Sequence, residues 1–164
     1  MTELANPPID LSAHISADRG RFQQHRKAFG TMSIDYMVSS SDTDGGLFIV
    51  ENTDDSKDGP PRHLHPEQEE WFYAVDGEYV VEVGDESYRL EPGDSVLAPR
   101  KIPHVWPHVG EGTGRLIVAF QPAGEMEAFF GALSQAKGTP SREELHRLFR
   151  SHGMEVTGPP LPVE

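Results

Sequence analysis

The sequence contains no cysteine and few basic residues, and each shortage excludes a class of function. Without cysteine there is no disulfide, no thiolate ligand and no cysteine nucleophile, so any metal ion must be held by nitrogen and oxygen atoms. Lysine and arginine number 14 against 27 aspartates and glutamates, which gives a formal net charge of −13. Because phosphate binding needs clustered basic residues, nucleic acid is not an expected partner.

Long apolar runs are also absent. Residues 1–8 have neither a basic start nor an apolar stretch, so we predict no secretory signal, no membrane partner and a cytoplasmic location, which the lack of cysteine also suits. The residues that the chain has in quantity are glycine (16) and proline (14). At 164 residues, this composition indicates one domain built from many short elements joined by turns.

Short β-type runs alternate with turn residues through most of the chain. Strands are expected at residues 32–38, 47–51, 63–65, 70–75, 79–83, 87–90, 95–98, 103–109 and 115–121. Residues 22–29 match helix and strand templates equally and are assigned to a strand because strands follow them. Asp76-Gly77 favours a type I′ hairpin in which residues 79–83 return beside residues 70–75. This pattern indicates an all-β sandwich or barrel rather than a βαβ fold.

The pattern changes after residue 124. Apolar residues then recur with helical spacing at Met126, Phe129, Phe130 and Leu133, and again at Leu145, Leu148 and Phe149. We predict two C-terminal helices that cover the barrel, the second beginning after an N-cap at Ser141, followed by an extended tail. The predicted organisation is an N-terminal arm at residues 1–20, a β-barrel at 21–124 and a helical segment with its tail at 125–164.

Four residues suggest a metal site. His63 and His65 stand two apart, so in an extended strand both imidazoles point to one face. Glu70 follows shortly after them and His104 comes further along the chain. Three imidazoles and a carboxylate suit a divalent transition metal ion, whether Fe, Mn, Co, Ni, Cu or Zn. The alternative is that these are ordinary core and surface histidines.

The segments around these residues resemble the paired motifs of the cupin superfamily, G(x)5HxH(x)3-4E(x)6G and G(x)5PxG(x)2H(x)3N. The matching positions are His63, His65, Glu70 and Gly77 in the first motif, and Gly93, Pro99 and His104 in the second. Three positions depart from the pattern, because Gly59 stands four rather than six residues before His63, Lys101 replaces a glycine and His108 replaces an asparagine.

Within that superfamily the chain is similar to small single-domain quercetin 2,3-dioxygenase-like cupins over about residues 31–161. The resemblance implies a double-stranded β-helix, or jelly-roll barrel, with one metal ion held by His63, His65, Glu70 and His104. It also implies a dioxygenase that uses O2 on a flavonol-like phenolic or enolic molecule, with Glu70 as the catalytic proton acceptor. The alternatives are a non-catalytic or polyketide-pathway cupin that binds an aromatic molecule, and a metal-dependent isomerase or decarboxylase.

Candidates for the substrate pocket come from strand alternation and from apolar character. They are Tyr36, Phe48, Phe72, Trp106, His108 and Phe120, and core packing is an equal explanation for Tyr36, Phe48 and Phe120. His108 is either a base near the metal or a polar barrel residue. Trp71 and Tyr73 are expected to face outward, and together with the N-terminal arm they suggest a homodimer. Arg62 and Arg100 either attract an anionic substrate or form local ion pairs.

Overall fold

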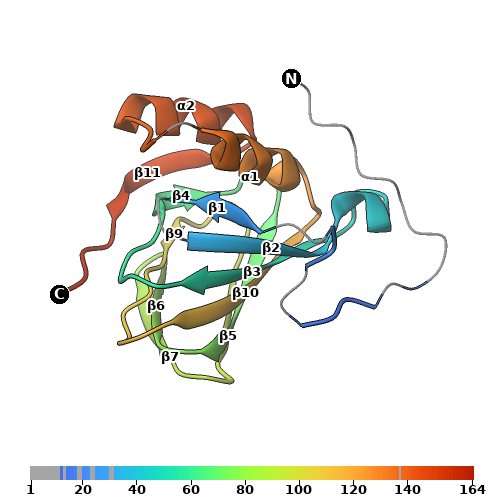
Figure 1. Cartoon of the computed structure of the whole chain (residues 1–164). Coiled ribbons are helices and arrows are strands. Elements are labelled where there is room, and N and C mark those ends of the chain that lie inside the picture. Colours follow the sequence, from blue (N-terminus) through green and yellow to red (C-terminus); the bar gives the residue numbers. More distant parts are fainter. Residues whose placement is uncertain (1–11, 13, 18–19, 23–24, 30–31, 137) are drawn as a thin grey trace.

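The computed structural model describes residues 12, 14–17, 20–22, 25–29, 32–136 and 138–164. Most of the predicted N-terminal arm at residues 1–20 lies outside this part of the chain. Within the described part, eleven strands form two antiparallel sheets, and two α-helices lie between the tenth and eleventh strands (Figure 1). The prediction of an all-β fold with two C-terminal helices is confirmed.

Each sheet joins strands that are distant in the sequence. The six-stranded sheet contains, in spatial order, β1 (Arg26–Ala28), β2 (Met32–Val38), β3 (Phe48–Asp54), β10 (Gly114–Gln121), β5 (Glu69–Asp76) and β8 (Ser95–Ala98). The five-stranded sheet contains β11 (Glu155–Pro160), β4 (Pro61–Leu64), β9 (His104–Val105), β6 (Tyr79–Val83) and β7 (Glu86–Leu90). The faces that the two sheets turn toward each other enclose the core.

Strand alternation explains which side chains enter this core. Along β10 every second residue is buried, and Leu116, Val118 and Phe120 are at most 2% exposed. In β3 the buried positions include Val50 and Asn52, which alternate with partly exposed residues. Because successive strand residues point to opposite faces, these side chains lie inside the barrel. The interior of β3 therefore carries a polar side chain, Asn52, as well as apolar ones.

The predicted hairpin at Asp76-Gly77 is wrong. β5 pairs with β10 and β8, whereas β6 pairs with β7 and β9, so the chain passes from one sheet to the other at this turn. Gly77 does adopt a positive φ of 76°, as the turn signal requires, but this conformation serves a crossing between sheets. Both edges of β5 are occupied by distant strands, which leaves no edge for β6. The tight hairpin lies instead at Gly84-Asp85, between β6 and β7.

Three other predicted segments differ in extent. Within residues 22–29 the described strand is β1, of three residues, and within 103–109 it is β9, of two. Proline at positions 103 and 107 restricts β9, since proline donates no ladder hydrogen bond. The tail is more ordered than predicted, because β11 pairs with β4, with Val156 opposite His63.

The helices cover one end of the barrel (Figure 1), as predicted. They are α1 (Met126–Gln135) and α2 (Arg142–Ser151). Ser141 begins α2 as the expected N-cap, and its hydroxyl accepts a hydrogen bond from the backbone N–H of Glu144 at 3.1 Å. Phe129 of α1 and Phe149 of α2 are both buried, with ring centroids 4.9 Å apart. This aromatic contact joins the two helices over the barrel end.

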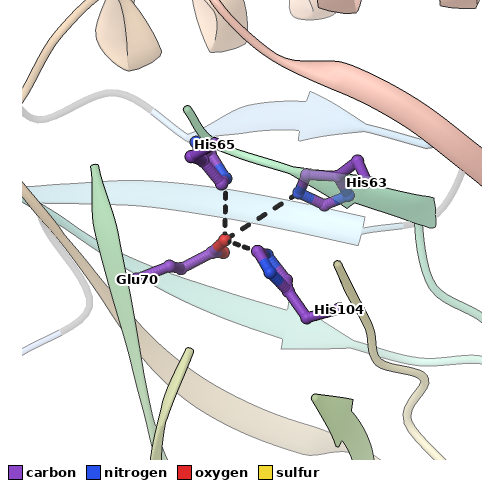
Figure 2. Close-up of side chains that lie close together, drawn as sticks. All are labelled: His63, His65, Glu70 and His104. Atoms are coloured by element: carbon purple, nitrogen blue, oxygen red, sulfur yellow. Dashed lines mark hydrogen bonds and ion pairs between the residues drawn. The ribbon is translucent and has the colours of Figure 1, made fainter. Parts of the chain in front are cut away.

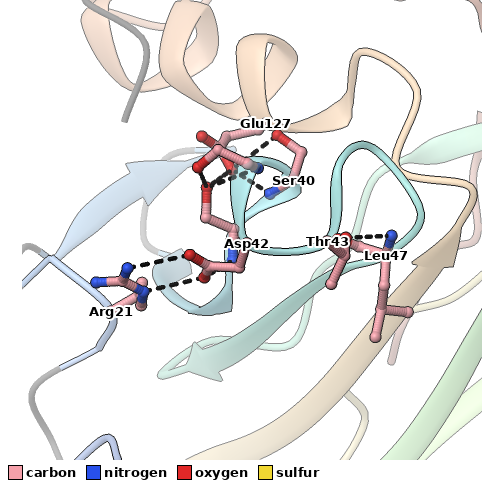
Figure 3. Close-up of polar contacts among 8 residues, drawn as sticks. Arg21, Ser40, Asp42, Thr43, Leu47 and Glu127 are labelled. Atoms are coloured by element: carbon pink, nitrogen blue, oxygen red, sulfur yellow. Dashed lines mark hydrogen bonds and ion pairs between the residues drawn. The ribbon is translucent and has the colours of Figure 1, made fainter. Parts of the chain in front are cut away.

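A 3-10 turn, η1 (Ser40–Thr43), fastens α1 to the barrel (Figure 3). The Glu127 carboxylate on α1 accepts hydrogen bonds from the Ser39 hydroxyl at 2.8 Å and from the first backbone N–H of η1 at 3.0 Å. On the other side of the turn, Arg21 donates two hydrogen bonds to Asp42, at 2.9 and 3.0 Å. The segment predicted as a loop at residues 39–46 is thus an ordered anchor for the first helix.

Candidate metal centre

The four predicted ligands converge inside the barrel (Figure 2). His63 and His104 are register partners on β4 and β9, His65 lies just beyond the end of β4, and Glu70 extends from β5 in the facing sheet. One potential ligand atom from each residue lies within 4.8 Å of all the others. Each of the four residues is at most 4% exposed. The site therefore depends on closure of the two sheets and not on one strand alone.

The imidazole nitrogens gather around one carboxylate oxygen. Glu70 Oε2 lies 2.9 Å from Nε2 of His65, 2.6 Å from Nε2 of His104 and 3.8 Å from Nε2 of His63. Four donor atoms at these separations need a positive charge between them, because lone pairs of nitrogen and oxygen otherwise repel. Either protons on the imidazoles or a metal ion can supply that charge.

Two of the imidazoles are oriented by backbone carbonyls. His63 Nδ1 lies 2.8 Å from the carbonyl oxygen of Pro61, and His104 Nδ1 lies 3.3 Å from that of Ile102. A carbonyl oxygen can only accept, so the proton of each ring is on Nδ1 and the ring donates there. In the neutral form of each ring, the lone pair of Nε2 then faces the centre of the cluster, which is the tautomer that a metal ion requires.

Gln68 orients the third imidazole, and sequence reasoning did not identify it. Its Nε2 donates to the carbonyl oxygens of Pro122 and Ala123, both at 2.8 Å, which leaves its Oε1 to accept from Nδ1 of His65 at 2.9 Å. Gln68 is 6% exposed. The available signal was its place between the paired histidines and Glu70, where a polar residue had no other assigned role.

The ionisation of these groups follows from burial and mutual contact. Burial and the neighbouring charge of His104 lower the pKa of His63 to about 4, so this ring is neutral at pH 7. Burial alone would lower the pKa of His65, but its hydrogen bonds with Glu70 and Gln68 raise it. Burial would likewise raise the pKa of Glu70, but the charge of His104 and contacts with all three imidazoles hold it well below its usual range. The Glu70 carboxylate is therefore ionised at neutral pH.

This donor set fits a divalent transition metal ion. Three Nε2 atoms with their opposite nitrogens held by acceptors, and one ionised carboxylate, form a set of nitrogen and oxygen ligands typical of Fe, Mn, Co, Ni, Cu and Zn sites. Among the residues that the structure describes, this is the group of histidines and acids whose ligand atoms gather at metal-binding distances.

A small, largely apolar cavity adjoins the cluster. His63 and Glu70 contribute to its wall, and its volume is about 30 Å³, enough for one or two water molecules. The apolar wall consists of Phe29, Met32, Pro60, Val118, Phe120, Met126, Phe129, Phe130, Phe149 and Met154. The remaining lining residues are Trp106 and Asn52. Side chains from both helices thus close the cavity above the histidines.

Two of the six predicted pocket residues, Trp106 and Phe120, line this cavity. Phe72 lies behind it and contacts His104 edge-on, with ring centroids 5.9 Å apart. Tyr36 and Phe48 belong to the surrounding core, where their rings meet at 5.0 Å. Alternation predicted which of these side chains enter the barrel, but the curvature of the sheets decided which of them reach the cavity.

His108 does not line the cavity, which favours the second of its two expected roles, that of a polar barrel residue. Its ring packs on Tyr79 with centroids 5.2 Å apart, and its Nδ1 donates to the carbonyl oxygen of Ser56 at 3.1 Å. The period-two argument failed because β9 ends at Val105, so the alternation from His104 does not continue to residue 108. His108 is a buried polar residue of the barrel.

The other two departures from the motifs have structural explanations. Lys101 has a φ of 72°, in the left-handed region where the motif has glycine, and its backbone N–H donates to the carbonyl oxygen of His65 at 2.8 Å. Gly59 packs directly on the chain after His104, because a Cβ there would lie 1.8 Å from the carbonyl oxygen of Trp106. Both positions join the loop of one motif to that of the other.

The outward residues lie as expected. Trp71 is 37% exposed and stacks on Tyr73, with ring centroids 5.7 Å apart. Arg62 is paired with Glu82, and Arg100 is paired with Glu69, so both arginines form local ion pairs.

Comparison with known proteins supports the same fold. Residues 53–120 match the family described as Cupin domain. An RmlC-like cupin from Shewanella frigidimarina is 25% identical, with a TM-score of 0.56 over 71% of this chain and 96% of that one. KdgF from a Halomonas species is 23% identical, with a TM-score of 0.54 over 60% of this chain and 86% of that one. The fold is the cupin double-stranded β-helix, and these matches support placing the chain in the cupin superfamily.

Two curated proteins are similar over shorter stretches. An oxidoreductase from Arthrobotrys oligospora is 32% identical over 60 residues, which cover 35% of this chain and 24% of that protein. Protein SchB from Streptomyces halstedii is 30% identical over 60 residues, which cover 37% of this chain and 44% of that protein. The chain thus matches less than half the length of either relative. Separately, none of the described helices is long and apolar enough to span a membrane.

Proposed function

We propose that this protein is a metal-dependent dioxygenase that acts on a flavonol-like phenolic or enolic small molecule. The observation that carries the proposal is the convergence of three imidazole Nε2 atoms and one ionised carboxylate at the wall of an otherwise apolar cavity. The similarity to an oxidoreductase of Arthrobotrys oligospora supports the same class of reaction. Fold similarity alone would not, since one fold serves many reactions.

The residues have separable roles in this proposal. His63, His65, Glu70 and His104 would hold a divalent metal ion, which when bound would supply Lewis-acid and redox chemistry toward a substrate oxygen and O2. Glu70 Oε2 is placed to accept the proton of the phenolic or enolic hydroxyl, because this oxygen faces the cluster and the carboxylate is ionised at neutral pH. The apolar wall excludes water from the activated substrate.

An aromatic substrate requires the cavity to open. A volume of about 30 Å³ accommodates water but no aromatic ring, so side chains of the helical cover must move when a phenol enters. Phe149 is placed to be one of them, since it lines the cavity and its ring centroid is 5.1 Å from that of His63. Binding of flavonols should therefore change the exposure of α2.

Oxygen uptake tests the proposal directly. The protein is loaded separately with Fe, Mn, Co and Ni, its metal content is measured, and oxygen consumption is followed with a panel of flavonols and catechols. We expect turnover with at least one metal and loss of both metal content and turnover in His63→Ala. Metal-loaded protein that consumes no oxygen with any member of the panel would refute the dioxygenase.

The small volume of the cavity favours a second candidate, an isomerase or decarboxylase that uses the same ion as a Lewis acid on a smaller enol or acid. This reaction needs no oxygen. Turnover of small enolisable acids under argon by the metal-loaded protein would select it over the dioxygenase, whereas ligand affinity without any turnover would select the third alternative, a binding protein for aromatic molecules.

We further propose that the protein is a homodimer joined through the outer face of β5 and β8. Trp71 and Leu97 are register partners there, Leu97 is 51% exposed, and β8 is an edge strand of its sheet. Leu97→Asp should shift gel-filtration elution from dimer to monomer. Tyr88→Asp is the control, since Tyr88 is also exposed but lies on β7 of the other sheet. Wild-type protein that elutes as a monomer would contradict the dimer.

A further inference from the structure

Asn52 is a buried polar residue with no assigned role. It lies on the interior face of β3, is 2% exposed and lines the cavity beside the metal centre. Its side-chain oxygen, Oδ1, is buried and has no hydrogen-bond partner within the described part of the protein. A buried amide oxygen without a partner destabilises a folded protein, so its presence calls for an explanation.

The surroundings of Asn52 do not supply that explanation. Its neighbours on the same face of β3 are Val50 and the buried acid Asp54, and its register partners are Leu116 on β10 and Ile34 on β2. Three of these four neighbours are apolar, and Asp54 makes no hydrogen bond to the side-chain oxygen of Asn52. Among the cavity-lining residues the other polar groups are His63 and Glu70, whose side chains already contact each other within the ligand cluster, and the indole of Trp106.

Strand register places Asn52 at a different depth of the barrel from the metal ligands. Asn52 is paired with Leu116 of β10, whereas Glu70 is paired with Phe120 of the same strand. Four residues separate these two positions, which corresponds to about 13 Å along an extended strand. The cavity therefore has one polar group at the metal centre and another toward the far part of its wall.

We propose that Asn52 selects the ligand by accepting a hydrogen bond from a hydroxyl or N–H group remote from the oxygen that meets the metal centre. The inference rests on the proposed function and extends it, because it names the substrate class as phenols or enols with a second polar donor at their far end. A site with an unpartnered acceptor discriminates strongly against an analogue that lacks the donor, since that analogue leaves the acceptor unpaired.

The test compares ligands that differ only at the far end. Binding is measured by calorimetry under argon to Zn(II)-loaded protein, which is redox-silent and so does not turn the ligand over. One pair of probes is hydroquinone and 4-methylphenol, and a longer pair is 4,4′-dihydroxybiphenyl and 4-hydroxy-4′-methylbiphenyl. The variants are Asn52→Leu and, as a matched control on the outer face of the same strand, Thr53→Val.

In the wild type and in Thr53→Val we expect one of the diphenols to bind about tenfold more tightly than its methyl analogue, and we expect Asn52→Leu to remove the difference. Equal affinities within both pairs in the wild type would overturn the role of Asn52 while leaving the proposed function intact. If none of the four phenols binds, the proposed function itself is contradicted, and the inference with it.

Thermal unfolding gives a readout that needs no ligand. If Asn52 is retained for binding, replacing it with an apolar residue relieves a buried unpaired oxygen, so the melting temperature of the Zn(II)-loaded protein should rise. Asn52→Val accompanies Asn52→Leu, because the smaller side chain cannot overpack the cavity. A rise in either variant supports the proposal. A fall in both would show that the amide stabilises the fold and would overturn it.

Discussion

At the scale of single residues, Gln68 links the metal centre to the chain that leads into the helices. It accepts from Nδ1 of His65 and donates to the carbonyl oxygens of Pro122 and Ala123, and the second of these residues is fully buried. The orientation of one ligand is thereby set by backbone more than fifty residues away in the sequence. Removing such a partner weakens metal sites even though the ligand itself remains.

We expect Gln68→Leu to lower metal affinity by roughly 10–100-fold, because His65 loses the acceptor that holds its tautomer and ring orientation. Competition with a chromophoric chelator measures the affinity for Zn(II) or Ni(II). Glu67→Gln is the matched control, since Glu67 is adjacent and exposed. Unchanged affinity in Gln68→Leu would show that Gln68 does not orient the ligand.

A second residue-scale prediction concerns Gly59. A Cβ at this position would lie 1.8 Å from Trp106 O and 2.9 Å from the Cα of Pro107, both backbone atoms. Neither backbone atom can move away unless the segment that follows His104 shifts. We therefore expect Gly59→Ala to lower the free energy of unfolding by about 1–3 kcal/mol. Urea unfolding measures the change. Gly112→Ala provides a contrast, because a Cβ there meets no atom within 4 Å and the effect is confined to backbone strain at its φ of 78°.

At the scale of elements, hydrogen bonds between α1 and η1 hold the helical cover, formed by α1 and α2, over the end of the barrel. Glu127 is the main polar contact between α1 and η1, and the Ser39 hydroxyl that donates to it is fully buried. The cover is therefore fixed at its first helix. Movement that opens the cavity is expected at α2, which follows residue 136 and carries Phe149.

We expect Glu127→Ala to lower the free energy of unfolding by about 1–3 kcal/mol, because the mutation removes the carboxylate that accepts hydrogen bonds from the Ser39 hydroxyl and the Ser40 backbone N–H. Chemical denaturation gives the value. The same experiment on Glu125→Ala should show a change of at most about 0.5 kcal/mol, since Glu125 is exposed and makes no side-chain cap bond to α1. Equal effects of the two substitutions would argue against the anchor.

At the scale of the whole molecule, a buried carboxyl makes stability depend on pH. Asp54 is 1% exposed, its Oδ2 accepts from the Tyr79 hydroxyl at 2.6 Å, and burial raises its pKa to about 7 from an ordinary value of 3.8. The folded state thus binds this proton more tightly than the unfolded chain does. The protonated carboxyl group therefore makes its full contribution to the free energy of unfolding below about pH 4, and this contribution is lost as the pH rises through 7.

We expect Asp54→Asn to remove this dependence. Relative to wild type, the variant should gain stability progressively between about pH 4 and pH 7, by up to about 4 kcal/mol from the size of the pKa shift. Urea unfolding at four pH values measures both proteins. Asp55→Asn, which alters an exposed neighbouring carboxylate, is the control. Its free energy of unfolding should change with pH almost as that of the wild type does. Parallel curves for Asp54→Asn would contradict a raised pKa in the folded state.

Local patterns and tertiary pairing contributed differently to the fold. The spans of β2, β6 and β8 were predicted to the residue, because alternating side chains and turn residues are local properties. The hairpin between β5 and β6 was predicted wrongly. The same turn residues suit a chain that folds back beside β5 and a chain that passes to the other sheet, and only the distant partners of β5, which occupy both its edges, distinguish the two.

The sequence by itself identified the four residues of the candidate metal centre. His63, His65, Glu70 and His104 could be named because paired histidines in an extended segment share a face and because the chain carries two motifs with fixed spacing. The tertiary structure alone decided the cavity, since its wall combines interior residues of both sheets with side chains of α1 and α2. The roles of Gln68 and Asn52 also became clear only there, because the hydrogen bonds from Gln68 to residues 122 and 123, and the lack of a partner for the Asn52 side-chain oxygen, depend on atoms distant in the sequence.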